Sequence, residues 1–259
     1  MPIPVIACGA GRMGSTVIES ISKDGRFRLV AVVERDDFPG IGGAMCGARL
    51  VSSAQLKDLL RESQGAVLVD FTDPQGAMEN VRMATSNGCN PVVGTTGLAQ
   101  AQMDEISSLV KRSGTSAVVS PNFSIGVNVF WRTCELLAGQ LPDADVEVIE
   151  WHHRGKRDAP SGTAKRAAEL IGARTGADEL VHGRSGERLR GREIGMHAVR
   201  AGDIVGEHTV LFAREGERIE LTHRAHSRLA FASGCLRAIE WVHGRSDGTV
   251  HTLCDVLGM

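Results

Sequence analysis

The sequence predicts an α/β fold, with a parallel-sheet domain first and a smaller α+β domain with a mixed or antiparallel sheet second. Three observations support this. Short apolar runs alternate with helix-like stretches over the first 120 residues, and a glycine-rich turn joins the first run to the first helix. Later in the chain, longer alternating runs follow one another across a tight turn, as in antiparallel hairpins.

The glycine-rich turn opens the chain. The apolar run 3–7 leads into it, and Met13, Val17 and Ile21 then recur at helical spacing. The turn itself consists of Gly9, Ala10, Gly11, Arg12, Met13 and Gly14. Between a strand and a helix this pattern indicates a Rossmann-type nucleotide site, because glycines let the backbone approach a pyrophosphate and the helix N-terminus stabilises its charge. A purely structural turn is the alternative.

The cofactor is predicted from the end of the second strand. That strand, 28–33, is followed by Glu34, twenty residues after Gly14. Glu34 can accept hydrogen bonds from ribose hydroxyls, which favours NADH, whereas Arg35 could pair with the 2′-phosphate of NADPH. The sequence therefore leaves both cofactors open.

Strands and helices then alternate through the rest of the first domain. Helices are predicted at 55–61, 74–87 and 98–113, and strands at 66–70, 91–93 and 117–120. Ligands of parallel sheets bind beyond the carboxyl ends of the strands, and the loops there suit a flat nicotinamide ring. Their candidate residues are Phe71, Gly94, Thr95, Thr96, Ser120, Pro121, Asn122 and Phe123. Taken singly, each of these loops could be an ordinary turn with no role in binding.

Residues 151–164, WHHRGKRDAPSGTA, form the densest group of chemical functions. The alternating run 145–150 predicts a strand, so His152 and His153 point to opposite faces if it continues. Lys156 follows and can supply a positive charge or a proton. A solvated basic loop before a helix is the alternative.

A helix is predicted from Ser161 to about residue 175, because Pro160 favours helix entry and Ser161 is a good N-cap. The N–H groups of Ser161, Gly162 and Thr163 would then be free donors at a positive dipole end. This predicts a site for a carboxylate or phosphate.

The remaining elements form the second sheet and a final helix. After a helix ending at 140, strands are predicted at 145–150, 194–199, 205–213 and 218–226, with a turn at 214–217, and a helix at 229–243. The segment 183–195 contains four arginines, which we interpret as a solvated loop; a mobile cover attracted to a bound dianion is the alternative.

The composition excludes several classes. A net charge of −2 and a pI near 6.5 provide no field for nucleic acid or an anionic membrane. No apolar run approaches a membrane span and no signal peptide is recognisable, which predicts a cytoplasmic protein. Six cysteines without a CxxC pair indicate reduced thiols. No metal site is expected, because His223 and His226 would face opposite sides of a strand.

Taken together, the motifs resemble the dihydrodipicolinate reductase family, now called 4-hydroxy-tetrahydrodipicolinate reductase, over the whole chain. The motifs are 11–14 (GRMG), 69–72 (VDFT), 93–97 (VGTTG), 121–124 (PNFS), 152–164 (HHRGKRDAPSGTA) and 202–212 (GDIVGEHTVLF). One departure is Cys8, which stands where the family commonly has the first glycine of G-x-x-G-R-M-G.

The resemblance implies NAD(P)H-dependent reduction of 4-hydroxy-tetrahydrodipicolinate to tetrahydrodipicolinate, on the diaminopimelate route to lysine. It implies a dinucleotide-binding domain at 1–120 and about 230–259, and a substrate-binding domain at 121–229 that assembles a homotetramer. His152 resembles the catalytic acid/base and Lys156 the proton donor. His153, Gly162 and Thr163 resemble substrate contacts of the small dicarboxylate, and the glycine turn, Glu34, Arg35, Gly94 to Thr96 and Ser120 to Phe123 resemble cofactor contacts.

Two other functions stay open from the residues alone. One is a different Rossmann dehydrogenase acting on an aspartate-derived substrate. The other is a protein that binds NAD(P)H as a sensor without turnover, although such a protein does not need the histidine, lysine and anion-site combination.

Overall fold

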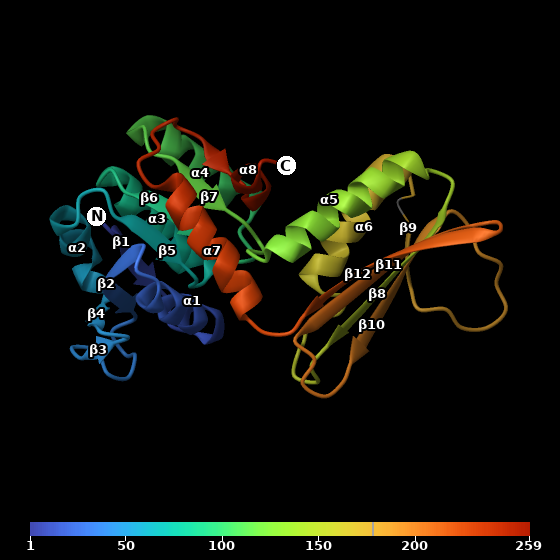
Figure 1. Cartoon of the computed structure of the whole chain (residues 1–259), viewed down its shortest axis with the longest axis horizontal. Coiled ribbons are helices and arrows are strands. Elements are labelled where there is room, and N and C mark those ends of the chain that lie inside the picture. Colours follow the sequence, from blue (N-terminus) through green and yellow to red (C-terminus); the bar gives the residue numbers. More distant parts are fainter. Residues whose placement is uncertain (178) are drawn as a thin grey trace. The chain divides into compact units, whose positions relative to one another are not determined.

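The computed structural model describes residues 1–177 and 179–259 and divides the chain into two compact units (Figure 1). The first unit consists of Met1–Ile125 and Leu229–Met259, and the second of Gly126–Arg228. The first unit is therefore discontinuous in sequence.

The first unit is built on an eight-stranded sheet in the order β13-β7-β6-β5-β1-β2-β4-β3, and its pairs are parallel except for β3 with β4. The strands are β1 (Ile3–Cys8), β2 (Phe27–Glu34), β3 (Ala44–Met45), β4 (Ala48–Ser52), β5 (Val67–Asp70), β6 (Asn90–Val93), β7 (Ala117–Val119) and β13 (Val250–His251). The prediction of a parallel α/β domain is confirmed.

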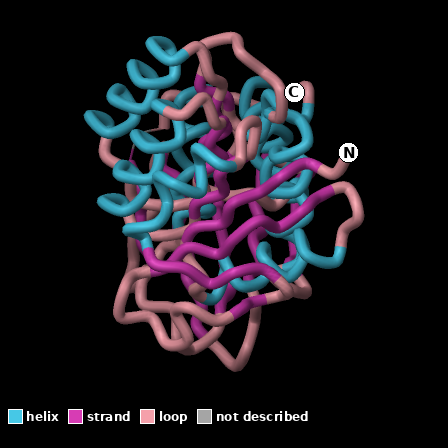
Figure 2. The backbone as a smooth tube through the Cα atoms, turned by 90° about the vertical axis from the view of Figure 1, so that its left-hand side faces the viewer, coloured by secondary structure: helices cyan, strands magenta, loops and turns pink. Residues whose placement is uncertain are grey.

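Helices cover both faces of this sheet (Figure 2). They are α1 (Arg12–Lys23), α2 (Leu56–Glu62), α3 (Pro74–Ser86), α4 (Gln100–Ser113), α7 (Leu229–Val242) and α8 (Leu253–Leu257), and a short 3₁₀ turn, η1 (Ser53–Gln55), precedes α2. Successive strand residues face opposite sides: Val5 packs with Val17 of α1 and Ile239 of α7, whereas Ile6 packs with Leu56 of α2. The helix predicted at 229–243 belongs to this unit.

Three strands of this sheet were not predicted, namely β13 and β3 at its edges and β4 beside β3. β4 is five residues long and follows a glycine-rich stretch, and β13 has only two residues. Strands this short show no measurable alternation in the sequence.

The second unit pairs helices with a five-stranded mixed sheet in the order β12-β11-β8-β10-β9. Its elements are α5 (Ile125–Gln140), β8 (Asp145–His152), α6 (Gly162–Thr175), β9 (Glu179–His182), β10 (Glu193–Arg200), β11 (Gly206–Arg214) and β12 (Glu217–Ala225). β8 and β10 are parallel, and β11 is antiparallel to both β8 and β12. The predicted mixed sheet with a hairpin is confirmed, and α5 ends at residue 140 as predicted.

One face of this sheet is buried under α5 and α6. Phe130 and Trp131 of α5 and Ile171 of α6 pack against Val146 and Val148 of β8. The alternation continues to the end of β8, so Glu150 and His152 lie on this same buried face. This parity places a carboxylate and an imidazole under the helices.

Residues 183–189, 191 and 192 are exposed, as expected for a solvated loop, but the arginines of this segment are paired. Arg184 and Arg188 form ion pairs with the buried carboxylate of Glu193. Arg190 donates to the carbonyl oxygens of Val146 and Glu193 at 2.8 and 3.0 Å. The guanidinium groups of these three arginines therefore each have an acceptor on the sheet.

None of the helices in the described ranges combines the length and the apolar character needed to cross a membrane.

Candidate active site

Three loops of the first unit meet beyond the carboxyl edge of its sheet, as the parallel order requires. The N–H of Phe71 donates to the carbonyl of Cys8 at 2.9 Å, and the N–H of Gly94 donates to that of Asp70 at 2.8 Å. The N–H of Ser120 donates to that of Val93 at 3.1 Å. Each loop is therefore fixed to the end of the neighbouring strand, and the predicted cofactor residues are brought together.

The glycine turn is sterically required. Gly9 has φ +90°, and a Cβ there would lie 2.7 Å from the carbonyl oxygen of Phe71. A Cβ at Gly14, inside α1, would collide with the carbonyl oxygen of Gly9. Gly11, the N-cap of α1, has open space where a Cβ would be and makes no side-chain cap. The turn thus packs tightly on one side and leaves the helix start accessible on the other.

Asp70 connects two of these loops. Its side chain is fully buried at the end of β5, and Oδ1 accepts hydrogen bonds from the hydroxyls of Thr72 at 2.8 Å and Thr95 at 2.7 Å. Oδ2 accepts from Asn80 Nδ2 at 2.7 Å. Burying a carboxylate is unfavourable unless its oxygens are hydrogen-bonded, so this network fixes the loops after β5 and β6.

Phe71 lies against the other two loops. Its ring occupies the space where a Cβ of Gly94 would be, and its centroid is 6.0 Å from that of Phe123. Thr96 and Pro121 are exposed beside them, Asn122 is half-buried, and Ser120 donates its hydroxyl proton to the carbonyl of Asn122 at 2.8 Å. Small and apolar groups therefore gather at this end of the sheet.

Glu34 is tied to the glycine turn. Its Oε1 accepts from the N–H of Ala10 at 2.5 Å and its Oε2 from the N–H of Arg35 at 3.1 Å. A carboxylate oxygen has a second lone pair, so each can still accept from a ribose hydroxyl. The side chain of Arg35 is exposed and lies 3.7 Å from Asp37.

These residues fit a dinucleotide. The start of α1 lacks a side-chain cap, the turn before it admits no side chain at Gly9 or Gly14, and an acidic residue ends the second strand. This combination accommodates a pyrophosphate at the helix N-terminus.

Cys8 does not weaken this site. Its thiol is buried, and burial together with the carboxylates of Asp70 and Glu34 holds its pKa well above the ordinary value. A protonated, inaccessible thiol is a poor nucleophile, so sensitivity to oxidation is not expected there.

In the second unit, Glu150 and His152 form a buried pair. Nδ1 of His152 is 2.5 Å from Oε2 of Glu150, and Arg200 donates from both terminal nitrogens to the two carboxylate oxygens at 2.8 Å each. Burial alone would raise the pKa of Glu150, but the hydrogen bonds from His152, Arg200 and the N–H of Ser161 lower it to about 2. Glu150 is therefore ionised.

One of the three N–H groups that were predicted to be free at the start of α6 is already hydrogen-bonded. The N–H of Ser161 is not free, because it donates to Oε1 of Glu150 at 3.0 Å. Ser161 is the N-cap: its Oγ accepts from the N–H of Ala164 at 3.2 Å, and α6 begins at Gly162. Pro160 precedes the cap, with a cis peptide bond from Ala159. Gly162 is exposed, and the carbonyl of Thr163 accepts from Trp131 Nε1 at 3.0 Å.

His153 and Lys156 lie in the loop between β8 and α6. His153 follows the end of the strand, and its carbonyl accepts from the N–H of Lys156 at 3.1 Å, which closes a turn. Lys156 Nζ forms an ion pair with Asp158 at 2.9 Å. Both side chains are half-buried.

His208 is a functional candidate that the sequence analysis missed. Its Nε2 is 3.1 Å from Oγ of Ser161, and its ring meets that of His152 edge-on at 5.2 Å. Burial first, then the charges of His152, His223 and Lys156, lower the pKa of His208 to about 3 against the raising effect of Glu150. Its Nδ1 has no hydrogen-bond partner among the described residues.

Glu150 and Arg200 were missed as well, although a signal for Glu150 exists. The alternation that buries Val146 and Val148 also buries Glu150 and His152. Arg200 is recognisable only from the pairing of β10 with β8, which places it opposite His152. Sequence periodicity does not give this register.

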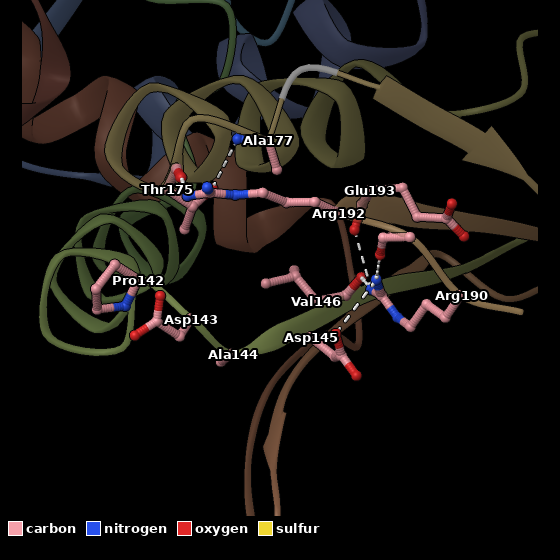
Figure 3. A pocket seen from close by; sticks show the side chains of 11 residues that line it. Pro142, Asp143, Ala144, Asp145, Val146, Thr175, Ala177, Arg190, Arg192 and Glu193 are labelled. Atoms are coloured by element: carbon pink, nitrogen blue, oxygen red, sulfur yellow. Dashed lines mark hydrogen bonds and ion pairs between the residues drawn. The ribbon is translucent and has the colours of Figure 1, made fainter.

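A hollow of about 300 Å³ lies elsewhere in this unit, between the turn before β8 and the segment before β10 (Figure 3). Arg190 and Arg192 line it with Asp143 and Asp145. None of the predicted site residues lines it. Within residues 1–177 and 179–259, no three His, Cys, Asp or Glu side chains are placed to hold a metal ion.

The fold and the turn define an NAD(P)-linked oxidoreductase with a separate α+β unit. Family models described as "Dihydrodipicolinate reductase, N-terminus" and "Dihydrodipicolinate reductase, C-terminus" match residues 3–123 and 126–257. The chain therefore belongs to the dihydrodipicolinate reductase family and is an NAD(P)H-dependent enzyme, as predicted.

Individual relatives are similar to this chain over nearly its full length. The 4-hydroxy-tetrahydrodipicolinate reductases of Methanocaldococcus jannaschii and Methanothermobacter thermautotrophicus are each 46% identical, over 99% of this chain and 98% and 99% of theirs. A solved structure, "Dipicolinate bound Dihydrodipicolinate reductase from Paenisporosarcina sp. TG-14", has 29% identity and a TM-score of 0.83, and covers 98% of this chain and 99% of that one. Neither alternative function is favoured.

Two glycine substitutions separate packing from cofactor binding. We expect Gly14→Ala to lower the free energy of unfolding by about 1–3 kcal/mol, because its Cβ forces the turn apart. Gly11→Ala meets no protein atom and should leave stability nearly unchanged while weakening NADH and NADPH binding. Thermal unfolding and calorimetric titration measure the two effects. Unchanged binding by Gly11→Ala would place the pyrophosphate elsewhere.

The low pKa of His208 predicts acid lability. Unfolded His208 binds a proton below about pH 6.5, whereas the folded residue resists until about pH 3. This residue therefore removes stability as pH falls through that window, by up to about 1.4 kcal/mol per pH unit. His208→Gln should flatten the slope of unfolding free energy against pH, measured with urea, and His243→Gln at an exposed position should not. Equal slopes in all three proteins would refute the buried neutral state.

Proposed function

We propose that this chain reduces 4-hydroxy-tetrahydrodipicolinate to tetrahydrodipicolinate with NADH or NADPH, in the cytoplasm and on the diaminopimelate route to lysine. The observation that carries the proposal is the arrangement at the end of β8, where His152 is held by an ionised carboxylate beside the start of α6. Full-length relatives named for this activity support it.

The reaction defines what the residues must do. Substrate and product differ by the 4-hydroxyl group, so the net change is loss of water with gain of one hydride and one proton. Reduced nicotinamide, when bound, supplies the hydride. The protein must then deliver a proton to the carbon that hydride addition leaves electron-rich. We assign this acid–base work to His152 and Lys156, whose ammonium is held by Asp158.

A flat substrate with two carboxylates needs two anchors. The first is the start of α6 at Gly162 and Thr163, since the positive dipole end of a helix is a favourable position for an anion. Ser161 fixes this start through its bonds to Glu150 and Ala164. The second anchor is His153 with Lys156. A solved relative is titled as dipicolinate bound, and dipicolinate is a flat dicarboxylate of this kind.

The dinucleotide-binding role belongs to residues 1–120 and about 230–259. The glycine turn (Gly9 to Gly14) binds the pyrophosphate and Glu34 the ribose, while Arg35 accommodates a 2′-phosphate. Phe71, Gly94 to Thr96 and Ser120 to Phe123 line the nicotinamide end.

Residues 121–229 provide substrate binding and assembly into a homotetramer. The sheet face away from α5 and α6 carries the half-buried apolar side chains Ile149, Trp151, Val199 and Leu211. The Glu147–His197 pair lies on the same face, and half-buried apolar side chains on a sheet face suit contact with other copies of the chain. Light scattering during size-exclusion chromatography should give four times the chain mass, and a monomer at micromolar concentration would refute the assembly.

Kinetics test the assignment. NADH or NADPH oxidation, followed at the reduced-nicotinamide absorbance, should occur only when the synthase product is supplied. His152→Gln and Lys156→Ala should each lower kcat by about 10²–10⁴-fold and leave the Kd of the reduced cofactor unchanged. Lys165→Ala, at an exposed position of α6, is the matched control. Pyridine-2,6-dicarboxylate should compete with the substrate.

Each negative result has a separate meaning. No turnover by the wild type would exclude the reductase activity. Full turnover by Lys156→Ala would remove its role as a proton donor, and failure of pyridine-2,6-dicarboxylate to compete would favour a dehydrogenase for another aspartate-derived substrate.

A further inference from the structure

A buried ionised carboxylate lies directly behind the proposed acid–base histidine. Glu150 is 1% exposed, and its oxygens accept from Nδ1 of His152, both terminal nitrogens of Arg200 and the N–H of Ser161. A charge at this depth is costly unless every lone pair is used. The arrangement therefore requires an explanation beyond packing.

We propose that Glu150 is a positioning residue, which fixes the tautomer and the orientation of His152 and is itself neutralised by Arg200. The inference rests on the proposed function, in which His152 exchanges a proton during the reaction.

The tautomer follows from hydrogen-bond chemistry. An ionised carboxylate only accepts hydrogen bonds, so Nδ1 of His152, 2.5 Å from Oε2, must carry the hydrogen. Nε2 is then the atom that takes up and releases protons. Histidines that act as acids or bases need such an orienting partner, because the wrong tautomer presents a hydrogen where a lone pair is required.

Two residues of the segment 202–212, one of the motifs shared with the family, fix the orientation of the His152 ring on two further sides. His208 meets the ring edge-on at an interplanar angle of 75°. A Cβ at Gly206 would lie 3.0 Å from Nε2 of His152, and Gly206 has no positive φ that would call for glycine. The absence of a side chain at Gly206 is thus explained by the space that the imidazole needs.

Arg200 extends the network to the loop. Besides the carboxylate, it donates to the carbonyl of Asp158 at 2.6 Å. Asp158 in turn pairs with Lys156, whose charge also acts on His208. The groups next to His152 are therefore Glu150 on its own strand, Arg200 on β10 and His208 on β11, and Lys156 joins this network through Asp158. One carboxylate holds the imidazole, the loop and the helix start in a single network.

The chain offers a control at an exposed position of the same unit. Glu169 of α6 forms an ion pair with Arg166 at 3.1 Å, and both side chains are exposed. Glu169→Gln removes the same charge from a residue outside the network around His152.

We expect Glu150→Gln to lower kcat at least about 10-fold, as loss of an orienting carboxylate can cost far more, with the Kd of the reduced cofactor unchanged. The amide can no longer accept from both Arg200 and His152, because one of its atoms is a donor. The kcat of Glu169→Gln should stay within about twofold of the wild type.

A double substitution separates positioning from a structural role. If Glu150 acts through His152, adding Glu150→Gln to His152→Gln should cause no further loss of kcat, whereas a structural role predicts additive losses. Additivity, or wild-type kcat in Glu150→Gln, overturns the inference. Wild-type activity in His152→Gln overturns the proposed acid–base role instead.

Two measurements remain decisive if Glu150→Gln does not fold. ¹⁵N NMR of the wild-type protein should show neutral His152 protonated at Nδ1, and protonation at Nε2 overturns the inference. Gly206→Ala keeps every charge but displaces the ring, so its kcat should fall while the Kd of the reduced cofactor is unchanged. An unchanged kcat in this variant also counts against the inference.

Discussion

The second unit depends on one buried charge. Glu150 lies where the apolar row of β8 ends, and a carboxylate there would cost several kcal/mol if left unpaired. Arg200 repays that cost with a two-point ion pair, and the backbone of Ser161 and the ring of His152 use the remaining lone pairs. The end of β8, the end of β10 and the start of α6 are held together because each contributes a donor to the same carboxylate.

The first unit also has a buried, hydrogen-bonded carboxylate at the end of a strand. Asp70 is the last residue of β5, is fully buried, and holds the hydroxyls of Thr72 and Thr95. Loops are ordinarily the most mobile parts of an α/β sheet. A buried acceptor with fixed donors instead gives these loops a defined geometry before a ligand binds, which reduces the entropy lost on binding.

The sequence predicts the parallel unit well because its signals are local: the glycine turn, the helical spacing of Val17 and Ile21, and the acidic residue at Glu34 all lie within one strand–helix–strand segment. The hydrogen-bond networks around Asp70 and Glu150 could not be predicted in the same way. Asp70 meets Thr95, and Glu150 meets Arg200, only after strands distant in sequence pair side by side. Burial of Glu150 was readable from its alternation with Val148, but not its partners.

The hydrogen bond made by the Ser161 N–H changes how the proposed anion site at the start of α6 would work. A free N–H there would add one donor to a bound carboxylate, but Glu150 already occupies it. The same carboxylate holds the imidazole of His152, so the helix start and the ring cannot shift independently. A dianion at the proposed anchor of Gly162 and Thr163 would then lie at a fixed distance from the imidazole, set by the covalent and hydrogen-bonded frame of this unit alone. Orientation of this kind lowers a barrier without any group moving during the reaction.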